Sequence, residues 1–121
     1  MNTEIESEVL GALKILYLKQ LKGRLFTLEQ AQLCFQLGQA SPTAYKSLGF
    51  EVHRLNGTGA TYGFPKISKA AKVLEEHLET EVCELDTVVK YLATLITAIN
   101  DTLVDSTSHA QDWPYGYFVP A

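Results

Sequence analysis

Apolar residues recur at helical spacing along almost the whole chain, and this periodicity is the feature that most limits its fold. Within residues 85–103 the apolar positions are three or four residues apart: Leu85, Val88, Leu92, Leu95, Ile99 and Leu103. This spacing places side chains on one face of an α-helix. The chain has no convincing alternation of period two, the pattern of a half-buried strand. The sequence therefore predicts an all-α fold.

The N-terminal third of the chain carries an apolar pattern that extends from Ile5 to Phe35. Gly23 interrupts this pattern, and glycine inside a helix costs about 0.5–1 kcal/mol relative to alanine. The pattern predicts either two helices with a bend near residues 21–24 or one long kinked helix. It ends at Gly38, which with the next residue forms a short connection.

Helix-starting residues divide the rest of the chain. Ser41 is a favourable N-cap residue, and Pro42 follows at the first helical position, where its missing N–H has no cost. Pro65 opens the next helix, and the last helix begins between Thr80 and Asp86. The connections are short, so successive long helices are expected to lie antiparallel.

The length of the chain, 121 residues, suits a single domain with its own core. We expect a helical bundle over residues 1–104 and a tail over residues 105–121, where two prolines and four aromatic residues break the helical pattern. The tail is expected to pack onto the bundle or lie loose, with docking to a partner as the alternative.

Charge and composition exclude several classes of function. The net charge of −4 argues against a nucleic-acid or anionic-membrane partner. The N-terminus lacks the basic and apolar regions of a secretory signal, and no apolar run approaches the ~18–20 residues of a membrane helix. We therefore expect a cytoplasmic protein. Cys34 and Cys83 have no neighbouring ligand at metal-site spacing, so no metal site is predicted.

His53 is the candidate reactive residue of the predicted helix that begins after Ser41. At about 100° per residue, Leu48 and Val52 define the core face, and His53 lies about 140° from Leu48. Gly49 and Gly57 are its neighbours one turn before and one turn after on the same face. Two missing side chains would leave the imidazole on a smooth strip that a partner can approach closely. The alternative is an exposed histidine with glycines that serve helix packing or a C-cap.

Residues 53–75 also resemble a known signature. The stretch His53-Arg-Leu-Asn-Gly-Thr-Gly, followed by Gly63-Phe64 and by Leu74-Glu75, is similar to the motif of histidine-containing phosphotransfer (HPt) domains. That motif is roughly H-x-L-K-G-S/T-small-x-x-x-G, followed by a helix ending near L-E. The segment Tyr17–Leu25 also resembles the kinked N-terminal segment of the family, so the resemblance covers most of residues 5–103.

The resemblance implies an antiparallel four-helix bundle with an additional N-terminal helix. It implies that His53 accepts a phosphoryl group from the aspartate of one receiver (response-regulator) domain and passes it to the aspartate of another. Gly57 would be the small residue beside the imidazole. Such domains are phosphocarriers without autonomous catalysis or cofactors of their own, because the Mg²⁺ belongs to the receiver. Partners would be receiver domains or a hybrid sensor histidine kinase, and the carrier would be a monomer.

One position departs from the family pattern. Asn56 stands where the family usually has a lysine that neutralises the phosphoryl group, and an amide carries no charge. Lys66 and Lys69 on the following helix are candidates to supply the charge. The residues expected to form a docking patch around His53 are Phe50, Tyr45 and Lys46.

Other functions remain open on the sequence. The missing lysine favours an interaction module that binds or inhibits a receiver or kinase without carrying phosphate. The chain could also be one domain of a larger sensor kinase, although Met1 and a complete bundle favour a free-standing protein. His77, among acidic residues, is interpreted as a salt-bridge partner, and His109 lies in the tail.

Overall fold

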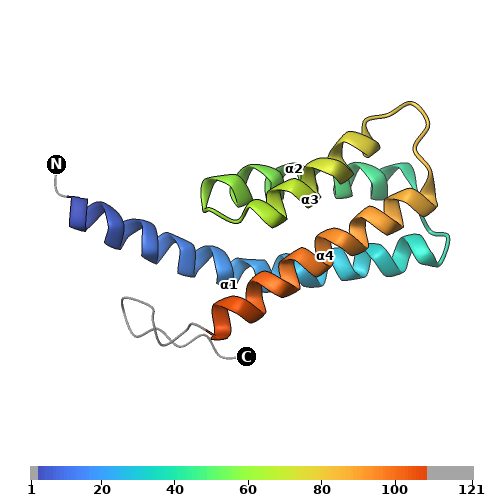
Figure 1. Ribbon diagram of the computed structural model, residues 1–121. Helices are drawn as coiled ribbons and strands as arrows, with labels where there is room; N and C mark the ends of the chain where they lie inside the picture. The colour runs from blue at the N-terminus through green and yellow to red at the C-terminus, as the bar shows by residue number, and fades with distance from the viewer. Residues whose placement is uncertain (1–2, 109–121) are drawn as a thin grey trace.

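The computed structural model describes residues 3–108, with side chains described over residues 8–106, and this part of the chain is helical without strands (Figure 1). Its four helices are α1 (Thr3–Gln36), α2 (Pro42–Thr61), α3 (Pro65–Leu78) and α4 (Leu85–Ser108). The all-α prediction is confirmed.

The N-terminal third forms one continuous helix, so the additional N-terminal helix is not a separate element. α1 passes through Gly23 without a break. The core residues Leu21 and Leu28 lie on either side of this glycine and are fully buried. Their burial, worth about 1.5–3 kcal/mol per side chain, exceeds the roughly 1 kcal/mol that a helical glycine costs.

The predicted helix starts and turns are where the sequence places them. The Ser41 hydroxyl accepts a hydrogen bond from the backbone N–H of Ala44, and Pro42 begins α2. Gly38 and Gly63 have φ values of +76° and +83°, a left-handed conformation that favours glycine. Gly38 lies in the turn after α1, and Gly63 lies in the turn after α2.

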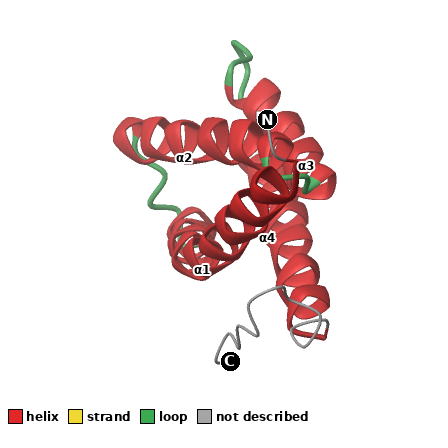
Figure 2. Ribbon diagram, turned by 90° about the vertical axis from the view of Figure 1, so that its left-hand side faces the viewer, coloured by secondary structure: helices red, strands yellow, loops and turns green. Residues whose placement is uncertain are grey.

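The helices run alternately in opposite directions along one long axis (Figure 1). α3 packs against both α2 and α4, and α4 packs against α1. Viewed from the end, the four helices surround a common centre, with α2 and α3 above α1 and α4 (Figure 2). The first turns of α1 project beyond the other helices at the end where α4 finishes (Figure 1).

The core is built from the apolar faces that the periodicity predicts. Tyr17 and Leu18 of α1 belong to the main core cluster, and Ile15 before them is also buried. The fully buried side chains include Leu21, Leu28, Phe35, Val52, Leu55, Ile67, Leu74, Val88, Leu92, Leu95 and Ile99.

Polar and aromatic contacts join α1 to α2. Arg24 Nη1 lies 2.9 Å from Glu51 Oε1, and both side chains are mostly buried. The Thr58 hydroxyl donates to the Tyr17 hydroxyl oxygen at 3.2 Å. The Tyr17 ring stacks on Tyr62, with ring centroids 4.8 Å apart. Burial raises the pKa of Tyr17 above its usual value of 10.0, so its phenol stays neutral.

The C-terminal part of the described chain differs from two expectations drawn from the sequence. α4 continues to Ser108, so it extends past the expected boundary at residue 104, and the rest of the tail lies outside the described residues. Contrary to the expectation that no apolar run is long enough, Leu85–Ser106 has the length and composition of a membrane span, with a mean hydropathy of 1.2. In the fold, its Leu92 and Leu95 side chains pack in the core.

Candidate functional site

His53 lies in α2, and its side chain is 78% exposed. The residues before and after it, Val52 and Leu55, are fully buried and fix the rotation of α2 on the core. Because one face of α2 is held by this packing, the face that carries His53 is turned outward. The imidazole therefore stands at the surface of a rigid helix rather than on a loop.

Glu75 of α3 contacts the His53 ring. Its Oε2 lies 2.5 Å from Nδ1 of His53, and the Glu75 side chain is only 17% exposed. A carboxylate beside Nδ1 favours the tautomer with the proton on that nitrogen. Nε2 is then the nitrogen with a free lone pair, and it is on the opposite side of the ring from Glu75.

Asn56 and Ser68 hold Glu75 in turn. The Asn56 side-chain amide donates to Glu75 Oε1 at 3.2 Å. The Ser68 hydroxyl lies 2.9 Å from the Asn56 side-chain oxygen and 3.0 Å from its backbone carbonyl. Asn56, which lies where the HPt motif that this sequence resembles has a lysine, therefore orients the carboxylate that orients the imidazole. Neither Glu75 nor Ser68 was predicted as a site residue from the sequence, and their helical spacing on α3 is the signal that places them on one face.

The glycines around His53 differ in what surrounds them. A Cβ atom at Gly49 or Gly57 would meet nothing within 4 Å, so helix packing does not require glycine at either position. Gly59 is the packing glycine: a Cβ there would lie 3.0 Å from the backbone nitrogen of Ser68. The strip of α2 on both sides of His53 is therefore open to solvent.

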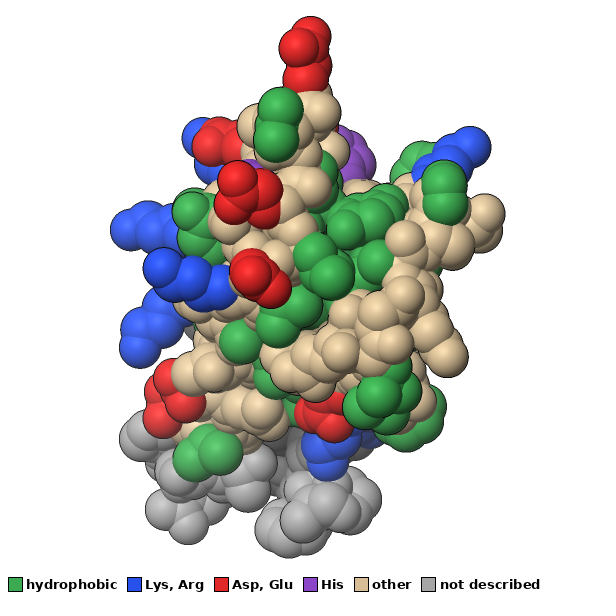
Figure 3. Space-filling model, turned by 90° about the vertical axis from the view of Figure 1, so that its right-hand side faces the viewer, with side chains coloured by type: hydrophobic (Ala, Val, Ile, Leu, Met, Phe, Trp, Pro, Cys, Tyr) green, Lys and Arg blue, Asp and Glu red, His purple; other side chains and the backbone are tan. Residues whose placement is uncertain are grey.

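A hollow of about 420 Å³ lies beside His53, on the Gly49 side. Phe50 is 65% exposed at its rim, and the Lys46 ammonium lies 6.0 Å from the centre of the Phe50 ring. The remaining lining residues are Tyr45, Gly49, Glu75, Leu78 and Glu79. The end view of the molecule shows hydrophobic side chains gathered on this face (Figure 3). Burial, and secondarily the Cys83 thiol, raises the pKa of Tyr45, which keeps this phenol neutral.

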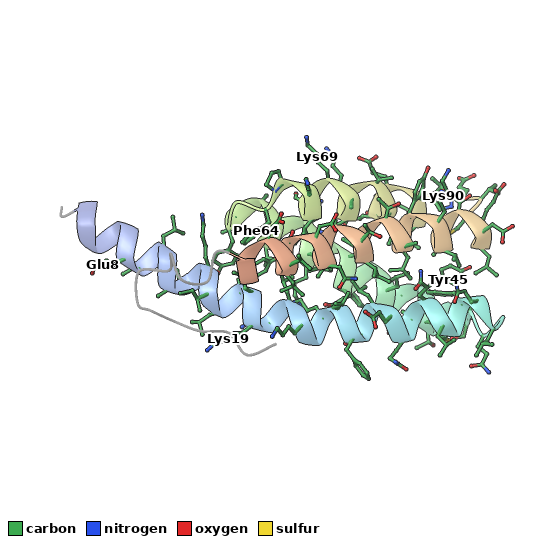
Figure 4. All side chains as sticks on the ribbon, turned by 60° about the horizontal axis from the view of Figure 1, so that its bottom comes forward. Glu8, Lys19, Tyr45, Phe64, Lys69 and Lys90 are labelled. Atoms are coloured by element: carbon green, nitrogen blue, oxygen red, sulfur yellow. The ribbon has the colours of Figure 1, made fainter. Side chains whose placement is uncertain are left out.

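The structure places the five lysines and aromatic residues predicted for docking in two groups. Lys46 shares the His53 hollow with Phe50 and Tyr45. Lys66 and Lys69 instead line a groove of about 510 Å³ between α3 and α4, together with Lys90. Lys69 and Lys90 point outward from these two helices (Figure 4).

Lys72 is a further cation, one that was not predicted as a site residue from the sequence. It is exposed on α3, four residues after Ser68 and three before Glu75. Helical spacing puts all three on one side of α3, where Ser68 and Glu75 contact α2. Lys72 is thus better placed than Lys66 or Lys69 to add positive charge near His53.

His77 has a structural role that differs from the expected salt bridge. Its Nε2 accepts a hydrogen bond from the backbone N–H of Glu84 at 3.2 Å. Its ring packs edge-on against Tyr91, with centroids 5.8 Å apart. These contacts tie the end of α3 to the start of α4.

Neither a group of metal ligands in the described residues nor a similar known protein indicates what this site does. Among the side chains of residues 8–106, no three histidine, cysteine or acidic residues are grouped so that they could hold a metal ion. Comparisons with protein-family models, with curated proteins and with solved structures give no match to this chain.

Proposed function

We propose that the protein is a phosphocarrier of the HPt type, in which His53 accepts a phosphoryl group from a receiver-domain aspartate and returns it to another. The observation that carries this proposal is the pairing of the exposed His53 with Glu75 through Nδ1. The antiparallel arrangement of four helices around one core supports it. A histidine held in this way presents its other nitrogen to a partner.

The transfer would be a direct displacement. The lone pair on Nε2 attacks phosphorus of the aspartyl phosphate, and the bond from phosphorus to the carboxylate oxygen breaks. The aspartate leaves as a carboxylate, and the histidine becomes an Nε2-phosphohistidine whose Nδ1–H stays on Glu75. Positioning and charge neutralisation dominate the catalysis of such transfers. The receiver would supply Mg²⁺, and this chain would supply an oriented nucleophile.

The surface around His53 suits contact with another protein. Open space at Gly49 and Gly57 lets a partner's active-site rim approach the ring. Phe50, Tyr45 and Leu78 offer apolar contacts in the hollow. Lys46 and Lys72 bring positive charge to a site that would otherwise gather negative charge from Glu75 and the phosphoryl group. Their positive charges would neutralise the phosphoryl group, as the lysine of the HPt motif does and as the uncharged amide of Asn56 cannot.

The test is phosphoryl transfer from a phosphorylated receiver domain to the purified chain. We expect a label on the native chain that is labile in acid and stable in base, as expected for phosphohistidine. His53→Gln should carry no label, and His77→Gln should be labelled like the native chain. Absence of label on the native chain with a panel of receivers would reject the carrier function.

The same experiment separates the alternative function. The missing family lysine at Asn56 is the observation that favours a module that binds a receiver or kinase without accepting phosphate. Equal binding of a receiver by the native chain and by His53→Gln, with no label on either, would support that module.

A further inference from the structure

The groove of about 510 Å³ between α3 and α4 has an apolar floor. The two helices pack side by side along it (Figure 1). α3 contributes Ala70 and Val73 to the floor, and α4 contributes the half-buried ring of Tyr91. Val73 is 46% exposed, although its side chain is large and apolar. The Thr94 hydroxyl donates to the backbone carbonyl of Lys90 at 3.2 Å, so it does not require a polar partner in the groove. The floor therefore offers apolar surface to a ligand.

Three lysines stand along the rim of this apolar floor. Lys66 and Lys69 belong to α3 and Lys90 belongs to α4, and all three are exposed. Figure 4 shows Lys69 and Lys90 pointing outward from the two helices. Among the described residues, no acidic side chain forms an ion pair with any of the three. Asp101 is the one acidic residue in the lining, so positive charge dominates it. A ligand that complements this groove is apolar on one side and negatively charged beside it.

The positions of the lysines distinguish a helical segment from a small amphiphile. Lys66 and Asp101 lie at the same end of the groove, since both also line a second hollow beside Gly63. Lys90 comes eleven residues before Asp101 in α4, which is a rise of about 16 Å. A single carboxylate headgroup cannot reach lysines at both ends. An amphipathic helix of about three turns spans this length, and it can present acidic residues to both ends while its apolar face fills the groove.

We propose that the groove between α3 and α4 binds an amphipathic helix of another protein that carries acidic residues beside its apolar face. This groove is separate from the His53 site, because Val73 lies about 160° around α3 from Glu75. A partner helix in the groove therefore leaves the imidazole accessible. Its binding does not depend on phosphoryl transfer by His53, so each function can be tested without the other.

The test is titration calorimetry of the full chain with a synthetic peptide. The peptide has about three helical turns, with leucines along one face and glutamates on both flanks. We expect the native chain to bind it about tenfold more tightly than a counterpart with lysines in place of the glutamates. Lys69→Glu should weaken binding of the acidic peptide by about tenfold, and the effect should shrink as salt is added. Arg54→Glu, which changes the net charge equally but lies on α2, should bind the peptide like the native chain.

A second pair of variants tests the apolar floor. Val73→Asp places a charge in the groove and should abolish peptide binding, whereas Val82→Asp, at another exposed valine, should leave it unchanged. Circular dichroism shows whether each variant is folded. No binding of the acidic peptide by the native chain, equal binding of the acidic and basic peptides, or normal binding by Lys69→Glu would overturn the proposal. Binding of decanoate without binding of the acidic peptide would also overturn it and would assign the groove to a single-headed amphiphile.

Discussion

Nδ1 of His53 lies 2.5 Å from Oε2 of Glu75, although the two residues are 22 positions apart and belong to different helices. The contact joins an exposed ring to a largely buried carboxylate. It determines which ring nitrogen can react, and most of the expected behaviour of the site follows from it.

Removing the carboxylate should slow phosphoryl transfer without removing the acceptor. In Glu75→Ala the proton is no longer held on Nδ1, so the tautomer that blocks Nε2 gains population. Loss of a charged hydrogen bond, worth about 1.5–3 kcal/mol, predicts a rate that is lower by roughly ten- to a hundredfold. Ring-nitrogen NMR shifts of His53 and the initial rate of labelling measure the two effects. Glu76→Ala, the exposed neighbour, is the control, and equal rates for both variants would contradict the role of Glu75.

A bulky side chain at position 57 should block phosphoryl transfer without impairing folding. Gly57→Leu fills the open strip beside the imidazole and should block transfer by excluding the partner. It should also raise the free energy of unfolding by about 0.5–1 kcal/mol, because leucine is the better helix former and meets no neighbour there. Gly23→Leu, at another open helical glycine, should give the same gain in stability with normal transfer. An active Gly57→Leu variant would show that access does not limit the reaction.

The lysines of the two grooves should behave differently in receiver binding. Lys46→Gln removes a cation from the His53 hollow and should weaken the complex by a few fold, an effect of about 0.2–1 kcal/mol for an exposed charge. The loss should shrink as salt is added. Lys69→Gln, in the groove between α3 and α4, should bind receiver like the native chain. Binding is measured by titration calorimetry, and a larger effect from Lys69 would move the docking surface to that groove.

Tyr17 should make the fold sensitive to alkaline pH. Its pKa is raised in the folded chain, chiefly by burial, so the native state keeps a proton that the unfolded chain releases above its pKa of 10.0. Ionisation of Tyr17 should therefore not affect the free energy of unfolding below that pH. Above it, the free energy of unfolding should decrease as the pH rises. Denaturant unfolding of the native chain and of Tyr17→Phe, at neutral and alkaline pH, measures the difference. Tyr17→Phe should lose less stability on alkalisation, and parallel losses would assign the effect to other groups.

The local features of the chain were predictable because each depends on residues close together in sequence. The periodic apolar positions gave the core faces of α2, α3 and α4, and Ser41 with Pro42 gave the start of α2. The same periodicity placed His53 outward. The continuity of α1 was one of two predicted outcomes, and the choice depended on whether Leu21 and Leu28 packed in one core.

Contacts between helices were decided only by the tertiary structure. The sequence of α3 does not determine how far this helix is rotated about its axis against α2, and that rotation brings Glu75 and Ser68 to the His53 side. It also carries Lys66 and Lys69 to the groove with α4. The packing role of Gly59 could not be predicted from the sequence either, because its close approach to Ser68 depends on how two helices pack. Helical hydrogen bonds fix the spacing within a segment, whereas packing of the whole core fixes which faces meet.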